Sequence, residues 1–306
     1  MNPATAPPVL GSAALVVNMA SRIGGDTFEF VCRRLIERGI DLAAAYPVRK
    51  PDQLRKVVER EIAAGRKLVI IGGGDGTATT VSRCFRDSDA VMGLLPLGTG
   101  NSFAQGLGLP LDIIGAADTL VTGKVAAVDL GIVNGRTFVN FTTLGLSTSV
   151  ARLTGPLQKR IFGPIAYVFT GIALARRSRA FECRLEADDG IHRFRTHQLV
   201  IANGRVYGST PIHPDARVDE GLLTVFAVPG ADRRHLRELW QALLAGRHAE
   251  MSGALFISTK HLKLETWPRR AIEMDGEIAT RTPATYSVAA RSLKIVVPQS
   301  FRETAL

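Results

Sequence analysis

Cysteine is scarce in this sequence. The chain of 306 residues has three cysteines, Cys32, Cys84 and Cys183, which lie far apart and form no CxxC pair. A disulfide framework is therefore not expected, and a reducing compartment such as the cytoplasm is favoured. The six histidines show no HExxH pattern and do not pair with cysteine, so we expect no zinc site.

Long hydrophobic runs are lacking as well. Residues 9–19 and 161–175 are the most apolar segments. Both are shorter than the ~20 residues that a membrane-spanning helix needs. Residues 1–8 carry no basic segment of the kind that opens a signal peptide. We therefore expect neither a targeting segment nor a spanning helix.

Aromatic residues make up only 6% of the chain, and acidic residues are fewer than basic residues. There are 38 lysines and arginines against 28 aspartates and glutamates, a net charge of +10, which favours an anionic partner. With few aromatics and no recognised module, nucleic acid is not expected, whereas a nucleotide or an anionic membrane surface is. The content of 46% hydrophobic and 22% charged residues is globular and excludes collagen-like, coiled-coil and wholly disordered chains.

The first half of the chain alternates between strand and helix patterns. Such alternation predicts parallel βαβ units, so residues 1–127 are expected to form an α/β nucleotide-binding domain with a parallel sheet flanked by helices. The expected strands are 13–18, 42–46, 67–71 and 90–95, and the expected helices are 26–38, 51–64 and 77–85.

The second half of the chain has a different sequence pattern, in which strand-like runs predominate. Asn134-Gly135 and Asp189-Gly190 each lie between apolar runs, as in tight β-hairpins. Further strand-like runs follow, interrupted by one expected helix at 233–244. Residues 128–306 are therefore predicted to form an antiparallel, β-rich second domain.

A glycine-rich turn, Gly72-Gly73-Gly74-Asp75-Gly76-Thr77, directly follows the third expected strand. Glycine lets the backbone approach a ligand closely, and successive N–H groups at a turn into a helix form an anion site. A carboxylate beside phosphates is repulsive unless a cation lies between them, so Asp75 indicates Mg²⁺. The Thr77 hydroxyl could cap the helix or contact phosphate. The alternative is a strand-to-helix turn without a ligand.

A second loop, Pro96-Leu97-Gly98-Thr99-Gly100-Asn101, follows the next strand. In a parallel sheet both loops lie at the carboxyl ends of their strands, where α/β proteins bind ligands. Thr99 and Asn101 could bond a phosphate or a base. Two such loops on successive strands predict a nucleotide site.

These loops resemble the catalytic domain of diacylglycerol kinases, particularly the bacterial soluble lipid kinases and their sphingosine- and ceramide-kinase relatives. GGDGT alone also occurs in NAD kinases and phosphofructokinases, but its combination with later segments is far more specific. The segments that carry the resemblance further are Val16 to Ser21, Ala202-Asn203-Gly204, Pro214 to Leu223 and Asp275-Gly276-Glu277.

The resemblance implies a role for each motif. The chain would have an α/β nucleotide domain and a β-sandwich domain for the lipid, with ATP as the phosphate donor. Asp75 would also handle Mg²⁺, and Glu277 would be the catalytic base that takes the proton of the lipid hydroxyl. The residues that would bind ATP are Asn18, Gly73, Gly74, Asp75, Gly76, Thr77, Gly98, Thr99 and Asn101.

The resemblance also implies a structural Mg²⁺ site. One acidic side chain and two backbone carbonyls would form it, here Glu220 with the carbonyls of Arg217 and Leu222. Because the family usually has aspartate where Glu220 stands, Asp219 is the alternative ligand.

The predicted protein is an ATP- and Mg²⁺-dependent lipid kinase, cytoplasmic and peripherally bound to an anionic membrane. Its substrate would be diacylglycerol, ceramide, a sphingoid base or a similar lipid alcohol. Basic residues flank the apolar segment 161–175, as interfacial docking requires, although a core helix with solvated ends fits equally well. Two other functions stay open: a soluble NAD-kinase-like phosphotransferase, and a catalytically silent nucleotide-binding membrane adaptor. A homo-oligomer is compatible with the sequence.

Overall fold

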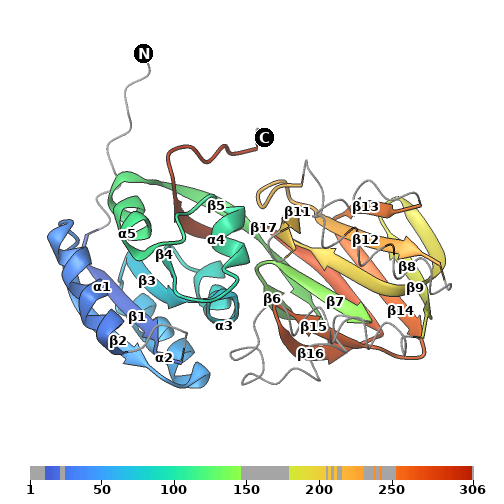
Figure 1. The fold of residues 1–306 in the computed structure, drawn as a ribbon, viewed down its shortest axis with the longest axis horizontal. Helices are drawn as coiled ribbons and strands as arrows, with labels where there is room; N and C mark the ends of the chain where they lie inside the picture. Colours follow the sequence, from blue (N-terminus) through green and yellow to red (C-terminus); the bar gives the residue numbers. More distant parts are fainter. Residues whose placement is uncertain are drawn as a thin grey trace, which may run out of the picture. The chain divides into compact units, whose positions relative to one another are not determined.

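The computed structural model describes residues 11–20, 25–145, 179–204, 206–207, 210–211, 216–230, 238, 242 and 253–304. The apolar segment 161–175 lies outside these residues, and so does almost all of the helix expected at 233–244. The chain forms two compact units (Figure 1). The first contains residues 1–130, 217–220 and 289–306, and the second contains 131–216 and 221–288.

The first unit has a parallel sheet in the order β4-β3-β1-β2, which β17 extends by pairing in parallel with β4. The β1, β3 and β4 strands are buried almost throughout, because helices cover both faces of the sheet. This explains their continuous apolar sequences. The strands are β1 (Ala13–Asn18), β2 (Leu42–Val48), β3 (Leu68–Gly73), β4 (Val91–Pro96) and β17 (Ala284–Val297).

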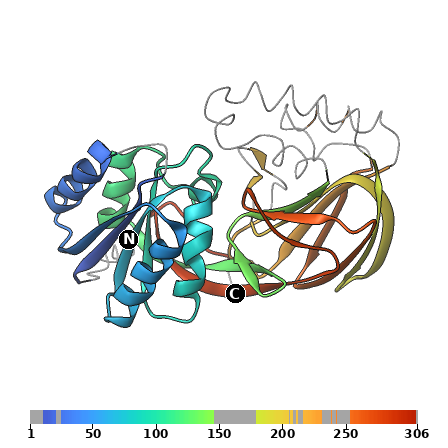
Figure 2. The same ribbon diagram turned by 90° about the horizontal axis from the view of Figure 1, so that it is seen from below.

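The helices of the first unit lie on opposite faces of its sheet (Figure 2). The α1 and α5 helices share an apolar cluster with one face, and α2 packs against α3 on the other. Local sequence explains where α2 begins and ends, since Pro51 occupies its first turn and Gly65 follows it with a φ of +80°. The helices are α1 (Gly25–Glu37), α2 (Pro51–Ala63), α3 (Asp75–Arg86), α4 (Ser102–Gly106) and α5 (Ile113–Thr122).

The second unit is an antiparallel β-sandwich. Its strands follow the order β16-β15-β7-β9-β8-β14-β17, and β12 pairs with both β9 and β13. The β5 strand (Lys124–Val133) leads from the first unit into the second. The other strands are β6 (Arg136–Phe138), β7 (Phe141–Gly145), β8 (Phe181–Ala187), β9 (Gly190–Ala202), β10 (Val206–Tyr207), β11 (Thr210–Pro211), β12 (Leu223–Pro229), β13 (Leu255–Thr259), β14 (His261–Trp267), β15 (Ala271–Met274) and β16 (Glu277–Arg281).

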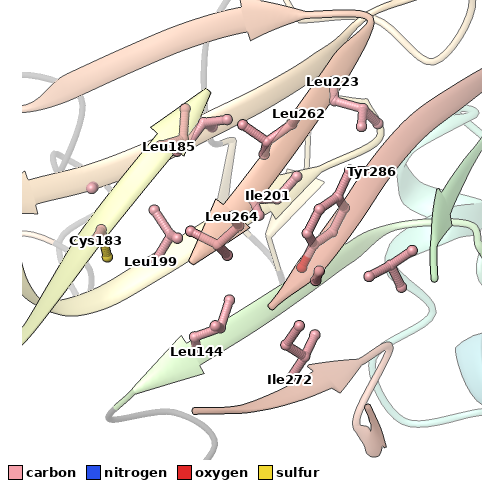
Figure 3. Close-up of a cluster of buried hydrophobic side chains, with 14 of the residues drawn as sticks. Leu144, Cys183, Leu185, Leu199, Ile201, Leu223, Leu262, Leu264, Ile272 and Tyr286 are labelled. Atoms are coloured by element: carbon pink, nitrogen blue, oxygen red, sulfur yellow. The ribbon is translucent and has the colours of Figure 1, made fainter. Parts of the chain in front are cut away.

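A large apolar core lies between the strands of the sandwich. Side chains from β7, β8, β9, β12, β14, β15 and β17 point toward one another there (Figure 3). Tyr286 is the polar member of this core. Its hydroxyl bonds the Thr142 hydroxyl at 3.1 Å, and burial raises the pKa of Tyr286. The alternating buried and exposed positions of β8 and β14 give each strand one core face.

Both hairpins expected from the sequence are present. Asn134 and Gly135 have φ values of +47° and +77°, which the turn between β5 and β6 requires. A tight turn before Gly190 joins β8 to β9. After the first hairpin, β6 ends at Phe138 and β7 begins at Phe141.

The compact units differ from the expected division into residues 1–127 and 128–306. The first unit ends its main segment at Leu130, close to the expected boundary, but it also includes 217–220 and 289–306. The reason is strand pairing: Ile295 of β17 pairs with Met92 of β4, so the last strand completes the sheet of the first unit. Such pairing between distant segments leaves no signal in local composition.

Candidate functional site

The two glycine-rich loops lie side by side in the first unit. The first joins β3 to α3 and the second joins β4 to α4, and the Leu97 N–H donates to the Gly73 carbonyl at 2.9 Å. A Cβ placed on Gly98 would lie 2.5 Å from the Gly74 Cα, and one on Gly74 would lie 3.0 Å from the Gly98 Cα. The two main chains therefore pack directly on each other, which only glycine permits at both positions.

Asp75 joins the two loops. Its Oδ2 accepts from the Ser102 N–H at 3.0 Å, and its Oδ1 accepts from the Phe103 N–H at 2.9 Å. The carboxylate lies in the first turn of α3 and bonds two N–H groups at the start of α4, where N–H groups have no partner within their own helix. A carboxylate has about four acceptor positions, and each Asp75 oxygen uses one of them for these bonds.

Asn18 and Thr77 connect the end of β1 with the first loop. The Asn18 Nδ2 donates to the Thr77 Oγ1 at 2.9 Å, and the Asn18 Oδ1 accepts from the Ala20 N–H at 3.0 Å. Thr77 is buried, and a Cβ on Gly73 would collide with its side chain. Asn18 therefore lies at the predicted nucleotide loop and holds its threonine in place.

Asn101, predicted to contact a phosphate or base, bonds the main chain of its own loop through its side chain. It is 7% exposed and has a φ of +50°. Its side-chain oxygen accepts from the Gly98 N–H at 2.9 Å, and its Nδ2 donates to the Gly98 and Pro96 carbonyls at 3.1 and 3.3 Å. The amide thus shapes the second loop from within, whereas Thr99 is exposed and accessible to a ligand.

The space beside Gly76 suits an anion. A Cβ on Gly76 would have no atom within 4 Å, so its backbone borders open space at the N-terminus of the 12-residue helix α3. The dipole of a helix and the N–H groups of its first turn favour negative charge at such a position. The first loop therefore fits the phosphates of a nucleotide.

The Asp-Gly-Glu segment forms the turn between β15 and β16 in the second unit. Asp275 and Gly276 have φ values of +46° and +96°, and Glu277 is the exposed first residue of β16. The Asp275 carboxylate accepts hydrogen bonds from three backbone N–H groups, those of Val139, Asn140 and Phe141. Sequence reasoning assigned no role to Asp275, although an aspartate before glycine is itself a turn signal.

The segment predicted to hold a structural Mg²⁺ is a tight turn in the first unit. The Glu220 carboxylate accepts from the Arg217 N–H at 3.2 Å. Burial, with the neighbouring Asp129 and Asp219 carboxylates, raises the pKa of Glu220. Leu222, the third predicted member, follows in the chain and is half-buried.

Asp219, the alternative ligand, is already engaged. Its oxygens accept from the Thr304 N–H and hydroxyl at 2.6 and 2.8 Å and from the Arg217 guanidinium at 3.1 Å. Burial opposes ionisation of this carboxyl, but these bonds outweigh it and lower the pKa of Asp219. Asp219 therefore anchors the C-terminal segment, and Glu220 is the better candidate for a cation.

Within the described ranges, no group of three or more His, Cys, Asp or Glu side chains is placed to hold a metal ion. The Mg²⁺ site predicted around Glu220 contains one such side chain and two carbonyls, so it stays a prediction. In the same part of the chain, no helix combines the length and apolarity that crossing a bilayer demands.

Comparisons with known proteins cover both halves of the chain. Residues 12–133 match the diacylglycerol kinase catalytic domain, and residues 141–297 match the YegS C-terminal NAD kinase beta sandwich-like domain. A diacylglycerol kinase of Staphylococcus epidermidis strain RP62A is 29% identical over 269 residues, which cover 86% of this chain and 84% of that protein. Another, from Staphylococcus haemolyticus, is 27% identical and covers 86% and 81%.

Solved structures show the same fold. A crystal structure of a diacylglycerol kinase from Bacillus anthracis gives a TM-score of 0.70 at 18% identity, and a second B. anthracis structure gives 0.80 at 19%. Each comparison covers 95% of this chain and 98% of the other. Together with the matches along both halves, the glycine loops and the Asp-Gly-Glu turn show that this chain belongs to the diacylglycerol kinase catalytic-domain family.

Proposed function

We propose that this protein is an ATP-dependent lipid kinase that phosphorylates a hydroxyl of a membrane lipid. The observation that carries the proposal is the packing of Gly74 on Gly98, with open space beside Gly76. Two stretches of main chain without side chains are suited to a triphosphate, because their N–H groups can point at its oxygens. Membership of a kinase family supports the same conclusion.

The first loop would hold the phosphates of ATP. Backbone N–H groups from Gly74 to Gly76 would donate to phosphate oxygens, and Asn18 would keep the Thr77 hydroxyl oriented. Asp75 would hold Mg²⁺ while its bonds to the start of α4 keep the two loops together. Bound Mg²⁺ supplies positive charge against the phosphates, which phosphoryl transfer requires.

Glu277 would take the proton from the lipid hydroxyl. A neutral alcohol is a weak nucleophile, and a carboxylate within hydrogen-bond reach activates it. Glu277 is exposed at the start of its strand, and Gly276 beside it has no side chain to obstruct a substrate. The net charge of +10 supports peripheral binding from the cytoplasm to an anionic membrane, where such a lipid is found.

The deciding experiment uses ATP labelled in the γ-phosphate, Mg²⁺ and mixed micelles of single lipids. Diacylglycerol, ceramide, a sphingoid base and phosphatidylglycerol form the panel. We expect label in the organic phase with at least one lipid. Glu277→Gln should lower the transfer rate by about 10²- to 10⁴-fold, the usual contribution of a general base. ATP binding should be unchanged.

A matched control distinguishes loss of the base from loss of surface charge. Glu182 is an exposed carboxylate on β8 of the same unit, and Glu182→Gln should keep wild-type activity. No organic-phase label with any lipid, in a protein that binds ATP, would refute the proposal. Full activity of Glu277→Gln would remove that residue from its role.

A soluble NAD-kinase-like phosphotransferase is the second candidate. The observation in its favour is the match of residues 141–297 to a domain described as NAD kinase beta sandwich-like. Adding NAD without lipid to the same assay tests it, since the label would then stay in the aqueous phase on the dinucleotide. ATP binding without transfer to any acceptor would indicate the silent adaptor.

A further inference from the structure

The Asp275 carboxylate accepts hydrogen bonds from the buried connection between β6 and β7. Its Oδ2 accepts from the Val139 N–H at 2.9 Å, and its Oδ1 accepts from the Asn140 and Phe141 N–H groups, each at 3.1 Å. Val139 is fully buried and Asn140 is 5% exposed, so these N–H groups need partners within the protein. The Asp275 N–H also donates to the Phe141 carbonyl at 3.1 Å.

Asn203 holds the same connection by its carbonyls. The Asn203 N–H donates to the Asn140 carbonyl at 2.7 Å, and its Nδ2 donates to the Val139 carbonyl at 3.2 Å. Asn203 is 3% exposed and follows β9. Two motifs that lie far apart in sequence, Ala202-Asn203-Gly204 and Asp275-Gly276-Glu277, thus bind opposite edges of the connection between β6 and β7.

Because Asp275 and Glu277 belong to the same turn, holding Asp275 in place also restrains the main chain at Glu277. Glu277 lies two residues after Asp275 in the sequence and pairs with Met274 across the turn. In the strand order of the sandwich, β16 is terminal and pairs with β15. Among the strands that the structure describes, the turn and the ladder to β15 therefore hold the main chain at Glu277.

We propose that Asp275 is a positioning residue for the transfer reaction, with Asn203 as its counterpart. Asp275 holds the β15–β16 turn against residues 139–141 and so places the Glu277 carboxylate for proton removal. The role of Glu277 as the base rests on the proposed function, whereas the clamp is a feature of the fold. Both Asp275 oxygens are occupied by backbone donors, which makes Asp275 a poor candidate for the base itself.

The first test needs no activity. Asp275→Asn keeps the shape but replaces one acceptor oxygen with an NH₂ group, which cannot accept from an N–H. We expect backbone amide hydrogen exchange to accelerate by at least tenfold at residues 139–141 in this variant, with no change on β8 and β14. Asp189→Asn, in the other Asp-Gly hairpin of this unit, is the matched control and should leave these amides unchanged. Unchanged exchange at 139–141 in Asp275→Asn would overturn the clamp.

The second test asks whether Asp275 acts through Glu277. Misplacing a catalytic group by about 1 Å can cost ~10²-fold in rate, so Asp275→Asn should lower kcat on that scale with the KM for ATP unchanged. In a Glu277→Gln background the same substitution should change kcat by less than about twofold, because no base is left to misplace. Equal losses in both backgrounds would overturn the positioning role.

The two tests separate this inference from the proposed function. If the wild-type protein transferred phosphate to no lipid, the proposed function and the role of Glu277 would fail together. The exchange measurement would still decide whether Asp275 clamps residues 139–141. Conversely, an active kinase with unaltered exchange in Asp275→Asn would contradict the clamp and leave the kinase assignment intact.

Discussion

Replacing Gly76 by alanine should separate nucleotide binding from folding. Gly76 lies in the first turn of α3, its φ is outside the left-handed region, and a Cβ there would have no atom within 4 Å. Alanine is favoured over glycine within a helix by up to about 1 kcal/mol. The free energy of unfolding without nucleotide should therefore stay the same or rise by up to that amount.

Nucleotide binding should respond in the opposite direction. If phosphates lie against the Gly76 backbone, the added methyl group takes part of their space. We expect the affinity for ATP to fall at least tenfold, which corresponds to about 1.4 kcal/mol of binding free energy. A variant that is as stable as wild type but binds nucleotide poorly would show that this glycine serves the ligand and not the fold.

Gly98→Ala provides the contrasting case. Its Cβ would lie 2.5 Å from the Gly74 Cα and 2.7 Å from the Asn101 Oδ1, so the two loops must move apart. Overpacking of this kind costs about 1–3 kcal/mol of stability, and nucleotide affinity should fall together with it.

Urea unfolding and calorimetric titration with a non-hydrolysable ATP analogue and Mg²⁺ would measure both quantities. Wild-type affinity in Gly76→Ala would refute the placement of phosphate beside this residue. Wild-type stability in Gly98→Ala would refute the close packing of the loops.

Three further predictions concern the fold that carries the site. Asp75→Asn should lower the free energy of unfolding by about 1–2 kcal/mol in urea titrations, since the amide cannot accept from both N–H groups at the start of α4. Asp87→Asn, at an exposed position, should leave the free energy of unfolding unchanged. Equal effects of the two substitutions would contradict the bridge between Asp75 and α4. Burial raises the pKa of Cys183 from 9.0 to about 12, so its contribution to stability is complete below pH 9 and declines as the pH rises toward 12. Urea titrations between pH 8 and 11 should then show a shallower decline for Cys183→Ala, and parallel curves would refute this. Asn134→Ala should lower the melting temperature more than Asn134→Gly, because the backbone there has a φ of +47°, and the reverse order would contradict the turn.

Much of the first unit could be predicted from local patterns. The apolar runs that became β1, β3 and β4 are buried on both faces, and such strands are recognisable without knowing their neighbours. The glycine loops after β3 and β4 could also be predicted, because successive glycines are typical of places where the backbone approaches another group closely. Asn134-Gly135 likewise marked its hairpin through the backbone conformation that the two residues favour.

Other features could not be predicted because they depend on partners distant in sequence. Nothing in its own segment showed that the Asn101 amide would bond Gly98 and Pro96. Nothing local showed that Asp75 would bond the start of α4, or that Asp275 would bond residues 139–141. A side chain's hydrogen-bond partner is set by which elements pack together, and that information is not contained in its own segment.

The order of residues alone indicated the parallel strands of the first unit, three of its helices, the glycine-rich loops and the kinase family to which they belong. Short-range preferences suffice for this, because backbone conformation and apolar periodicity are properties of neighbouring residues. Only the tertiary structure decided that the last strand completes the first sheet, that Gly74 packs on Gly98, and that Asn203 and Asp275 hold one connection from its two edges. Such contacts arise when segments far apart in the chain bury their surfaces together, and packing chooses among many partners that the sequence would allow.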